Sequence, residues 1–393
     1  MILLAILAGL ACLPLIVTDA VFLVEVLLGL RSSGQGGLAR PSGSIALIVP
    51  AHNEEGVVRA SVEKMIAEAP AGTRVIVVAH NCSDGTAEQA RAGGAEVHVL
   101  DEPDRRGKGY ALAGGKAALM AAPPATVIVV DADCTPAAGA IARLAATAEK
   151  SGRAVQASYL FAPRRDAGPI VQISNFAMLV KNLVRQRGGR RIGAPALMTG
   201  SGMAFPWPVY ASLDLATGNI VEDLAMGVDL VRRGRAPLFE PRATIWSHPS
   251  SEQGTGTQRA RWEGGFLATA RIFGLPLLLR GIGRLDWQML WMGLHLLTAP
   301  LTLLLILNAA AVALWGVLWL IGAAPLVAPI AALGLCGLVV VAVLAAWALA
   351  GRAMLSAATL ARLPLYMVWK LALYARIVRG RETPDWIRTE RVD

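Results

Sequence analysis

The stretch Thr126–Asp133 reads TVIVVDAD, in which five residues of high β-propensity run directly into two aspartates separated by one alanine. The apolar run predicts a buried strand over Thr126–Val130. Asp131 and Asp133 then lie at its carboxyl end, and two carboxylates this close repel each other unless a divalent cation lies between them and a diphosphate. The stretch therefore predicts a sheet with a metal-dependent site at its carboxyl edge.

Further β-rich runs and helix-like stretches alternate with this strand along the chain. The β-rich runs are Ile45–Val49, Arg74–Ala79 and Glu96–Leu100, and the helix-like stretches lie near 57–69, 85–93, 107–121 and 137–150. Strands that alternate with helices of this length predict βαβ units and a mainly parallel sheet, which is an α/β fold. In such sheets ligands bind beyond the carboxyl ends of the strands.

Polar clusters follow the first two strands as well. The first is PAHNEE over residues 50–55, and the second is NCSDGT over residues 81–86. Each cluster alone is explained by a polar cap at a helix start. Their common place at strand ends, together with Asp131 and Asp133, predicts one shared site instead.

Two polar motifs lie further downstream. Residues 217–223 read TGNIVED and open a stretch with helical spacing, for which a capped helix is the simplest interpretation. Residues 258–262 read QRARW and precede the apolar part of the chain, where arginine and tryptophan also serve as interfacial anchors.

The composition indicates that much of the chain meets lipid. Charged residues make up 17% of the 393 residues, against about a quarter in soluble domains, and residues 287–351 contain no Asp, Glu, Lys or Arg. This stretch predicts two spans near 301–321 and 326–349, joined by the turn Gly322–Pro325. The net charge of +9 comes largely from basic residues beside the apolar runs, which indicates membrane lipid and excludes nucleic acid as partner.

The first thirty residues predict a retained transmembrane helix, because they lack a basic start and a cleavage site. Asp19 and Glu25 need an explanation there. We expect them to lie near the cytoplasmic interface; the alternative is that they face protein or water. The four cysteines are scattered without metal-ligand spacing, which favours a reducing, cytoplasmic setting.

The five motifs, in this order and spacing, resemble those of the membrane-bound family 2 glycosyltransferases. That family includes the processive synthases of cellulose, hyaluronan and poly-N-acetylglucosamine. The resemblance covers about residues 45–265, the flanking helices and the tail from Trp386 to Arg391. It implies a Rossmann-like GT-A domain and an inverting transfer from a UDP-sugar.

The resemblance also implies a role for each motif residue on the donor side. Asp84 would bind uracil, and Asp131 and Asp133 would hold the ribose and a Mg²⁺ or Mn²⁺ ion on the diphosphate. The remaining donor-side residues would be Pro50, His52 and Glu54 around base and ribose, Lys108 as positive charge, and Arg261 on the leaving diphosphate. This chain departs from the family at His80, where an acidic residue is usual.

The resemblance also implies roles for the residues on the acceptor side. Asp223 would be the general base, with Glu222 beside it. Trp262 would stack on the acceptor sugar near Gln258, and Gly200, Ser201 and Gly202 would leave room for the acceptor terminus.

With this resemblance, the expected organisation has five parts. They are a transmembrane helix over 1–30, a cytoplasmic GT-A domain over 31–270, an interfacial segment over 271–299, a transmembrane hairpin over 300–350, and a cytoplasmic interfacial helix with a basic tail over 351–393. Within the last part, the interfacial helix is expected from Leu363 to Val378. We expect the protein in the bacterial inner membrane, associated with other membrane proteins of polysaccharide synthesis.

Three other functions compete. A sugar nucleotidyltransferase would need neither spans nor the QRARW motif, and a catalytically decayed membrane subunit would not keep nearly all reactive positions. A processive synthase that elongates and secretes a β-linked polymer is the main alternative. About three helices provide little wall for a polymer channel, so we expect transfer to a lipid-linked or membrane-embedded saccharide.

Overall fold

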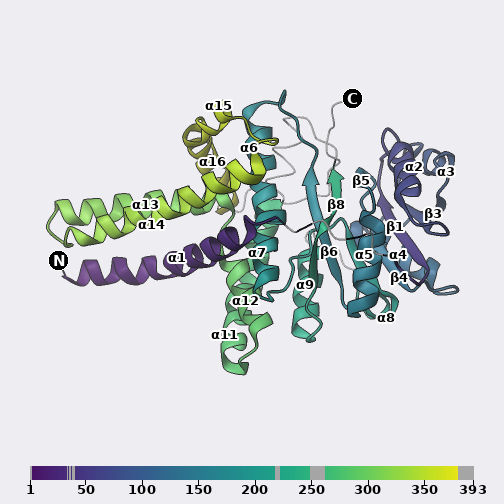
Figure 1. The fold of residues 1–393 in the computed structure, drawn as a ribbon, viewed down its shortest axis with the longest axis horizontal. Helices are drawn as coiled ribbons and strands as arrows, with labels where there is room; N and C mark the ends of the chain where they lie inside the picture. Colours follow the sequence, from purple (N-terminus) through teal and green to yellow (C-terminus); the bar gives the residue numbers. More distant parts are fainter. Residues whose placement is uncertain are drawn as a thin grey trace. The chain divides into compact units, whose positions relative to one another are not determined.

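The computed structural model describes residues 2–32, 34, 37, 40–216, 222–247 and 262–378. The chain forms two compact units (Figure 1). The sheet unit contains Ser33–Ala162 and Gly193–Thr269, and the helical unit contains Met1–Ser32, Pro163–Ile192 and the described part of Ala270–Glu382. The segment Pro163–Ile192 thus packs with the terminal helices, although the sequence predicts one continuous domain over 31–270.

The sheet unit is built on an eight-stranded sheet of order β3-β2-β1-β4-β7-β6-β8-β5. The first four strands along the chain are parallel, and Ile48 of β1 pairs with Ile76 on one side and Val129 on the other. Beyond β4 the sheet is mixed, because β7 is antiparallel to both β4 and β6. The strands are β1 (Ile45–Ala51), β2 (Arg74–His80), β3 (Glu96–Leu100), β4 (Thr126–Val129), β5 (Cys134–Pro136), β6 (Val155–Phe161), β7 (Met203–Pro206) and β8 (Leu238–Ser247). The predicted α/β class is confirmed.

Helices cover both faces of this sheet. Leu47 packs into the core formed with α2, α3 and α5, whereas its neighbour Ile48 packs into the core formed with α4, α8 and α9. Both side chains are fully buried, as expected for a strand covered on both faces. These helices are α2 (Val58–Glu68), α3 (Thr86–Ala92), α4 (Lys108–Leu119), α5 (Ala140–Ser151), α8 (Trp207–Ala211) and α9 (Glu222–Arg232).

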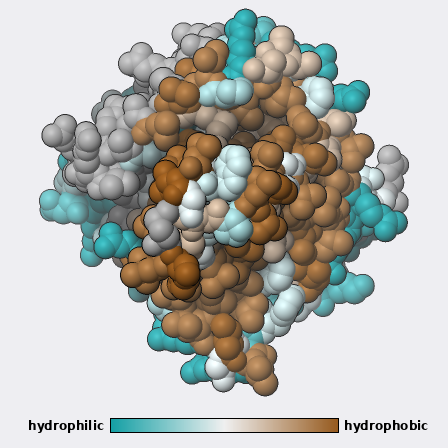
Figure 2. Space-filling model, turned by 90° about the vertical axis from the view of Figure 1, so that its left-hand side faces the viewer, coloured by the Kyte–Doolittle hydropathy of each residue, from teal (hydrophilic) through white to brown (hydrophobic). Residues whose placement is uncertain are grey.

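The helical unit contains most of the apolar helical residues of the chain, although Trp262–Thr269 belong to the sheet unit. Within the described residues, four helices are long and apolar enough to cross a membrane: Ile2–Gly29, Trp262–Arg284, Leu301–Leu320 and Val327–Gly351. Three of them match the predicted spans closely, and Trp262–Arg284 is an additional candidate. Exposed apolar side chains such as Leu3, Leu320 and Leu326 surround the ends of these helices, and apolar side chains dominate the face shown in Figure 2.

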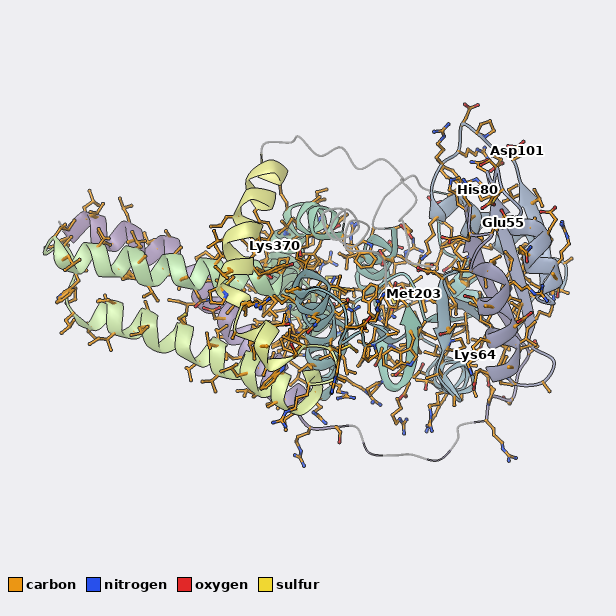
Figure 3. The ribbon with its side chains drawn as sticks, turned by 90° about the horizontal axis from the view of Figure 1, so that it is seen from above. Glu55, Lys64, His80, Asp101, Met203 and Lys370 are labelled. Atoms are coloured by element: carbon orange, nitrogen blue, oxygen red, sulfur yellow. The ribbon has the colours of Figure 1, made fainter. Side chains whose placement is uncertain are left out.

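The remaining helices of this unit are shorter. They are α6 (Pro169–Leu179), η1 (Val180–Arg185), α7 (Gln186–Arg191), η2 (Ala270–Gly274), α11 (Leu275–Arg284), α12 (Trp287–Leu297), η3 (Trp347–Gly351), α15 (Ala357–Leu360) and α16 (Leu363–Val378); the long ones are α1 (Ile2–Gly29), α13 (Leu301–Leu320) and α14 (Val327–Ala346). α16 has the predicted bounds, and its Lys370 (Figure 3) is 1% exposed, with Nζ 5.9 Å and 5.5 Å from the ring centroids of Tyr366 and Tyr374.

The two acidic residues of α1 are buried in protein, which supports the alternative to the interfacial placement. Glu25 accepts hydrogen bonds from Arg185 Nε at 2.6 Å, Trp291 Nε1 at 2.9 Å and His295 Nδ1 at 2.6 Å. Asp19 Oδ1 accepts a hydrogen bond from Asn308 Nδ2 at 2.9 Å. Both carboxylates therefore join α1 to segments that are distant in the sequence.

Candidate functional site

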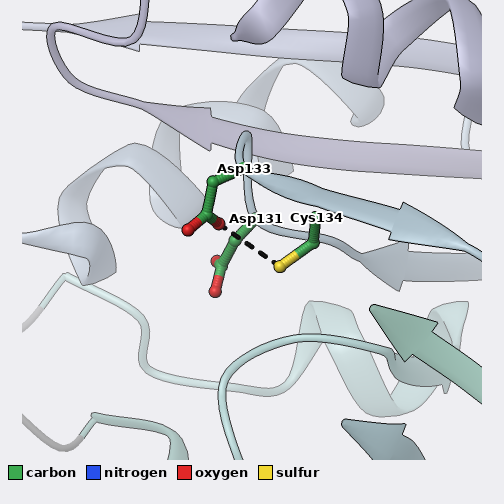
Figure 4. A group of neighbouring side chains, drawn as sticks. All are labelled: Asp131, Asp133 and Cys134. Carbon is green, nitrogen blue, oxygen red and sulfur yellow. Dashed lines mark hydrogen bonds between the residues drawn. The ribbon is translucent and has the colours of Figure 1, made fainter. Parts of the chain in front are cut away.

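The Asp-x-Asp triplet lies just beyond β4, at the carboxyl edge of the parallel strands (Figure 4). One ligand atom from each of Asp131, Asp133 and Cys134 lies within 4.8 Å of the others. Cys134 Sγ donates a hydrogen bond to Asp133 Oδ1 at 3.3 Å, and burial raises the pKa of this thiol well above its usual value. The protonated thiol is a poor ligand, so the two carboxylates form the oxygen donor set that Mg²⁺ and Mn²⁺ prefer.

Lys108, the first residue of α4, lies against these carboxylates. Its Nζ is 2.5 Å from Asp131 Oδ1, donates to the Gly200 carbonyl oxygen at 2.8 Å, and lies 4.0 Å from Glu222 Oε1. Burial alone would lower the pKa of Lys108, but Asp131, Glu222 and Asp223 together raise it above its usual value. The lysine is therefore a charged ammonium that joins the donor and acceptor sides of the predicted site.

Glu222 and Asp223 begin helix α9 and face the same cluster. Burial, with a further contribution from the Asp223 charge, raises the pKa of Glu222 to about 8. Asp223 Oδ1 accepts a hydrogen bond from its neighbour's backbone, Leu224 N, at 2.8 Å. The raised pKa favours the protonated form of Glu222, and the base role of Asp223 stays a prediction.

The glycine loop lies beside these groups because only glycine fits there. Gly200 and Gly202 have φ of +88° and +71°, in the left-handed region that side chains disfavour. A Cβ on Gly200 would lie 3.2 Å from Asp223 Oδ2 and 3.3 Å from Lys108 Nζ. Ser201 Oγ accepts a hydrogen bond from Asp131 N at 3.1 Å. The loop thus connects the acceptor residues to the metal-binding turn.

Gln156 is a supporting residue that the sequence did not indicate. It is fully buried on β6, its Nε2 donates to the Ser201 carbonyl oxygen at 2.8 Å, and its Oε1 accepts from Thr199 N at 3.0 Å. These two hydrogen bonds connect β6 to the backbone of the glycine loop at residues 199 and 201. A buried glutamine in a β-rich run is the only signal that could have pointed to it.

The predicted nucleotide residues lie on the two loops that follow β1 and β2. His52 Nδ1 donates to the His80 carbonyl oxygen at 2.8 Å, and Glu54 N donates to Thr86 Oγ1 at 2.7 Å. Asp84 accepts from Thr86 N at 3.1 Å and from Glu55 N at 3.3 Å. Asp84 therefore accepts from the first residue of α3 and ties the two loops together, and Pro50 is the penultimate residue of β1.

His80, labelled with Glu55 in Figure 3, is fully buried at the end of β2. Burial lowers the pKa of His80, so the ring is neutral at pH 7. Its Nδ1 has no hydrogen-bond partner among the described residues. Among the described residues, the group of three metal-ligating side chains consists of Asp131, Asp133 and Cys134 and includes neither histidine.

Trp262 is placed by an aromatic contact with the sheet. Its ring centroid lies 6.0 Å from that of Phe161, the last residue of β6, with the rings tilted by 40°. Gln258 and Arg261, the other residues of its motif, lie outside the described residues, as do residues 217–221 before Glu222. The roles of Gln258 and Arg261 stay predictions.

Known proteins match this chain at both the sequence and the fold level. The model of the family described as "Glycosyltransferase like family 2" matches residues 41–265. Uncharacterized glycosyltransferases of Mycobacterium tuberculosis (strain H37Rv) and Mycobacterium bovis are each 37% identical over 107 residues, which is 27% of this chain and 44% of their own length. The chain thus matches less than half of each relative.

A solved structure matches nearly the whole chain. It is a mannosyltransferase from Pyrobaculum calidifontis in complex with GDP-mannose and Mn²⁺, with a TM-score of 0.58 and 17% identity, and the match covers 96% of this chain and 99% of that one. At this identity the likeness shows a shared fold.

Proposed function

Because this chain belongs to glycosyltransferase family 2, we propose that it transfers a sugar from a UDP-sugar, with inversion, to a lipid-linked or membrane-embedded saccharide. The protein is a glycosyltransferase with a GT-A fold. The observation that carries the proposal is the cluster of Lys108, Asp131, Gly200 and Asp223, in which the groups for donor and acceptor lie side by side.

On the donor side, Asp131 and Asp133 would hold Mn²⁺ or Mg²⁺, which when bound neutralises charge on the leaving diphosphate. Lys108 adds a second positive charge, and Arg261 a third. Asp84, Pro50, His52 and Glu54 surround the base and ribose. The related Pyrobaculum structure holds GDP-mannose, so GDP-sugars belong in the donor panel beside UDP-sugars.

In the transfer, the acceptor hydroxyl oxygen attacks the anomeric carbon opposite the nucleotide. The new glycosidic bond forms as the bond to the diphosphate oxygen breaks, and the hydroxyl proton goes to Asp223. Burial raises the pKa of Glu222 and favours its protonated form, which makes it less available than Asp223 as the base. Trp262, whose ring contacts that of Phe161, would stack on the acceptor sugar, and Gln258 would lie near this sugar. Gly200, Ser201 and Gly202 would leave room for the acceptor terminus.

A single transfer is favoured over polymer secretion by the interior of the helical unit. Asp19 and Glu25 of α1 are buried and accept hydrogen bonds from Asn308 and Arg185, so both carboxylates take part in contacts within the protein. We therefore propose a membrane-embedded acceptor, and a bacterial inner-membrane location. The length of the product made by the purified protein tests this, because a ladder of long chains would contradict single transfer.

Nucleotide release identifies the reaction class. Incubation with UDP- and GDP-sugars and a membrane extract should release the nucleoside diphosphate from one donor. A nucleotidyltransferase would instead form pyrophosphate from a nucleoside triphosphate and a sugar phosphate, and a decayed subunit would give neither product.

We expect activity to require a divalent cation. EDTA should abolish transfer and added Mn²⁺ or Mg²⁺ should restore it, because Asp131 and Asp133 bind the donor diphosphate through the ion. Asp133→Ala should weaken UDP binding measured by calorimetry with Mn²⁺ present. Asp166→Ala, at an exposed aspartate paired with Arg164, is the control and should bind UDP normally. Full activity in EDTA would contradict the metal site.

We also expect residues 31–286 and the tail after Arg352 to lie in the cytoplasm, because basic residues flank the apolar runs there. Reporter fusions after Arg40 and at Asp393 should then report the same side. If Trp262–Arg284 also crosses the bilayer, three crossings separate the two fusion points and the reporters will disagree.

A further inference from the structure

Lys108 lies against one of the two carboxylates that we propose bind the metal ion. Its ammonium lies 2.5 Å from Asp131 Oδ1, 2.8 Å from the Gly200 oxygen and 4.0 Å from Glu222 Oε1. Its side chain is 18% exposed, and the Asp131 side chain 25% exposed, so water screens the pair only partly. Among the ion pairs of the described residues, Lys108 is the basic partner of Asp131, and its ammonium also lies near Glu222.

We propose that Lys108 is the built-in counter-cation of the donor-free site and that it makes metal binding depend on the nucleotide. The inference rests on the proposed function, since it assumes that Asp131 and Asp133 bind the ion. Without nucleotide, the ammonium neutralises Asp131 and repels an incoming divalent cation. With nucleotide bound, the diphosphate offers the ammonium new oxygen partners, and Asp131 is released to the metal.

The chemistry of the ligands gives this exchange its direction. A carboxylate that already binds an ammonium at 2.5 Å attracts a second cation less than a free carboxylate does. Diphosphate oxygens are strong acceptors for an ammonium, which binds phosphate as a point charge. Bound nucleotide therefore strengthens metal binding, and bound metal strengthens nucleotide binding by the same factor, because such coupling is reciprocal by thermodynamic necessity.

The geometry separates Lys108 from the other lysine of α4. Lys116 Nζ donates to the carbonyl oxygens of Ala211 and Leu213 at 3.3 Å and 2.8 Å, which is a structural contact with backbone alone. Lys108 has one backbone partner and a carboxylate of the metal-binding turn. Only Lys108 is therefore placed to exchange one anionic partner for another.

The test measures Mn²⁺ binding to the full-length, detergent-solubilised protein, by calorimetry or by electron paramagnetic resonance, with and without UDP. Lys108→Met removes the charge at nearly constant length. We expect it to bind Mn²⁺ about 5–100-fold more tightly than the natural protein when UDP is absent, the usual range for coupled sites. UDP should raise the Mn²⁺ affinity of the natural protein markedly and that of Lys108→Met much less.

Two further variants control for a folding defect and for the general effect of removing a lysine charge. Lys108→Gln keeps a donor for the Gly200 oxygen without the charge, carries the same expectation, and covers a folding defect of Lys108→Met. Lys64→Met is the matched control, because Lys64 on α2 (Figure 3) is exposed and pairs only with Glu68 among the ion pairs of the described residues. It should leave both affinities unchanged.

The outcomes distinguish this inference from the function it rests on. Unchanged or weaker Mn²⁺ binding in both Lys108 variants, or an unchanged effect of UDP, overturns the counter-cation role alone. Absence of Mn²⁺ binding in every protein, with and without UDP, overturns the proposed metal site and this inference with it.

Discussion

Asp223→Asn should lower the rate of sugar transfer by about 10²–10⁴-fold while UDP binding stays near its natural strength, since general base catalysis contributes in that range. Asparagine nearly preserves the shape of the side chain but cannot take the proton of the acceptor hydroxyl. The Asp223 charge is one cause of the raised pKa of Glu222 and is lost in this variant, but burial, the largest cause, remains and still favours the protonated form of Glu222. Nucleotide release gives the rate, and calorimetry gives the affinity for UDP.

The matched control for this exchange lies on the same helix. Asp229 of α9 is partly exposed and pairs with Arg233 at 2.6 Å, so Asp229→Asn should transfer sugar at the natural rate. Asp133→Ala should instead damage UDP binding, which separates the donor site from the base. A near-natural rate for Asp223→Asn would mean that another residue takes the proton and that our assignment is wrong.

The second large effect is expected at Glu25. Glu25→Gln removes the charge that Arg185, itself only 5% exposed, faces at 2.6 Å. Breaking a buried ion pair on one side typically costs about 3–5 kcal/mol, because the remaining charge is left uncompensated. We therefore expect a clearly lower midpoint of thermal unfolding for the detergent-solubilised variant.

A double variant distinguishes the ion pair from other effects of the exchange. Glu25→Gln combined with Arg185→Met leaves no buried charge in this pair and should recover most of the lost stability. Glu63→Gln, at an exposed glutamate paired with Arg59 on α2, should change stability by less than about 1 kcal/mol. If the double variant is no more stable than Glu25→Gln, the ion pair is not what stabilises this region.

The sequence predicted the regular half of the sheet well because its pattern is local. Leu47 and Ile48 belong to a run of buried apolar residues that favours a strand covered on both faces, and helix α16 has the predicted bounds. The other half was missed for physical reasons. β5 and β7 are only three and four residues long, and β6 contains the polar Gln156 and Ser158, so their pairing depends on distant partners.

The candidate site shows the same division. Asp131 and Asp133 could be assigned from a strand that ends in two carboxylates. Lys108 and Gly200 are 92 residues apart in the sequence, so no local pattern around either residue predicts their hydrogen bond. The partners of Glu25 lie 160 and 270 residues further along the chain, which is why an interfacial position looked simpler than a buried ion pair.

The pairing of α1 has a consequence for biogenesis. α1 is synthesised before its partners, because Arg185 follows Glu25 by 160 residues and Asn308 follows Asp19 by 289 residues. An unpaired aspartate at the centre of a membrane helix costs about 2.5–3.5 kcal/mol on the insertion scale. The nascent helix therefore reaches its final environment only after α13 has been translated. Exchanging α1 for an unrelated apolar helix would keep its apolar character but remove the two carboxylates that accept hydrogen bonds from Arg185, His295 and Asn308.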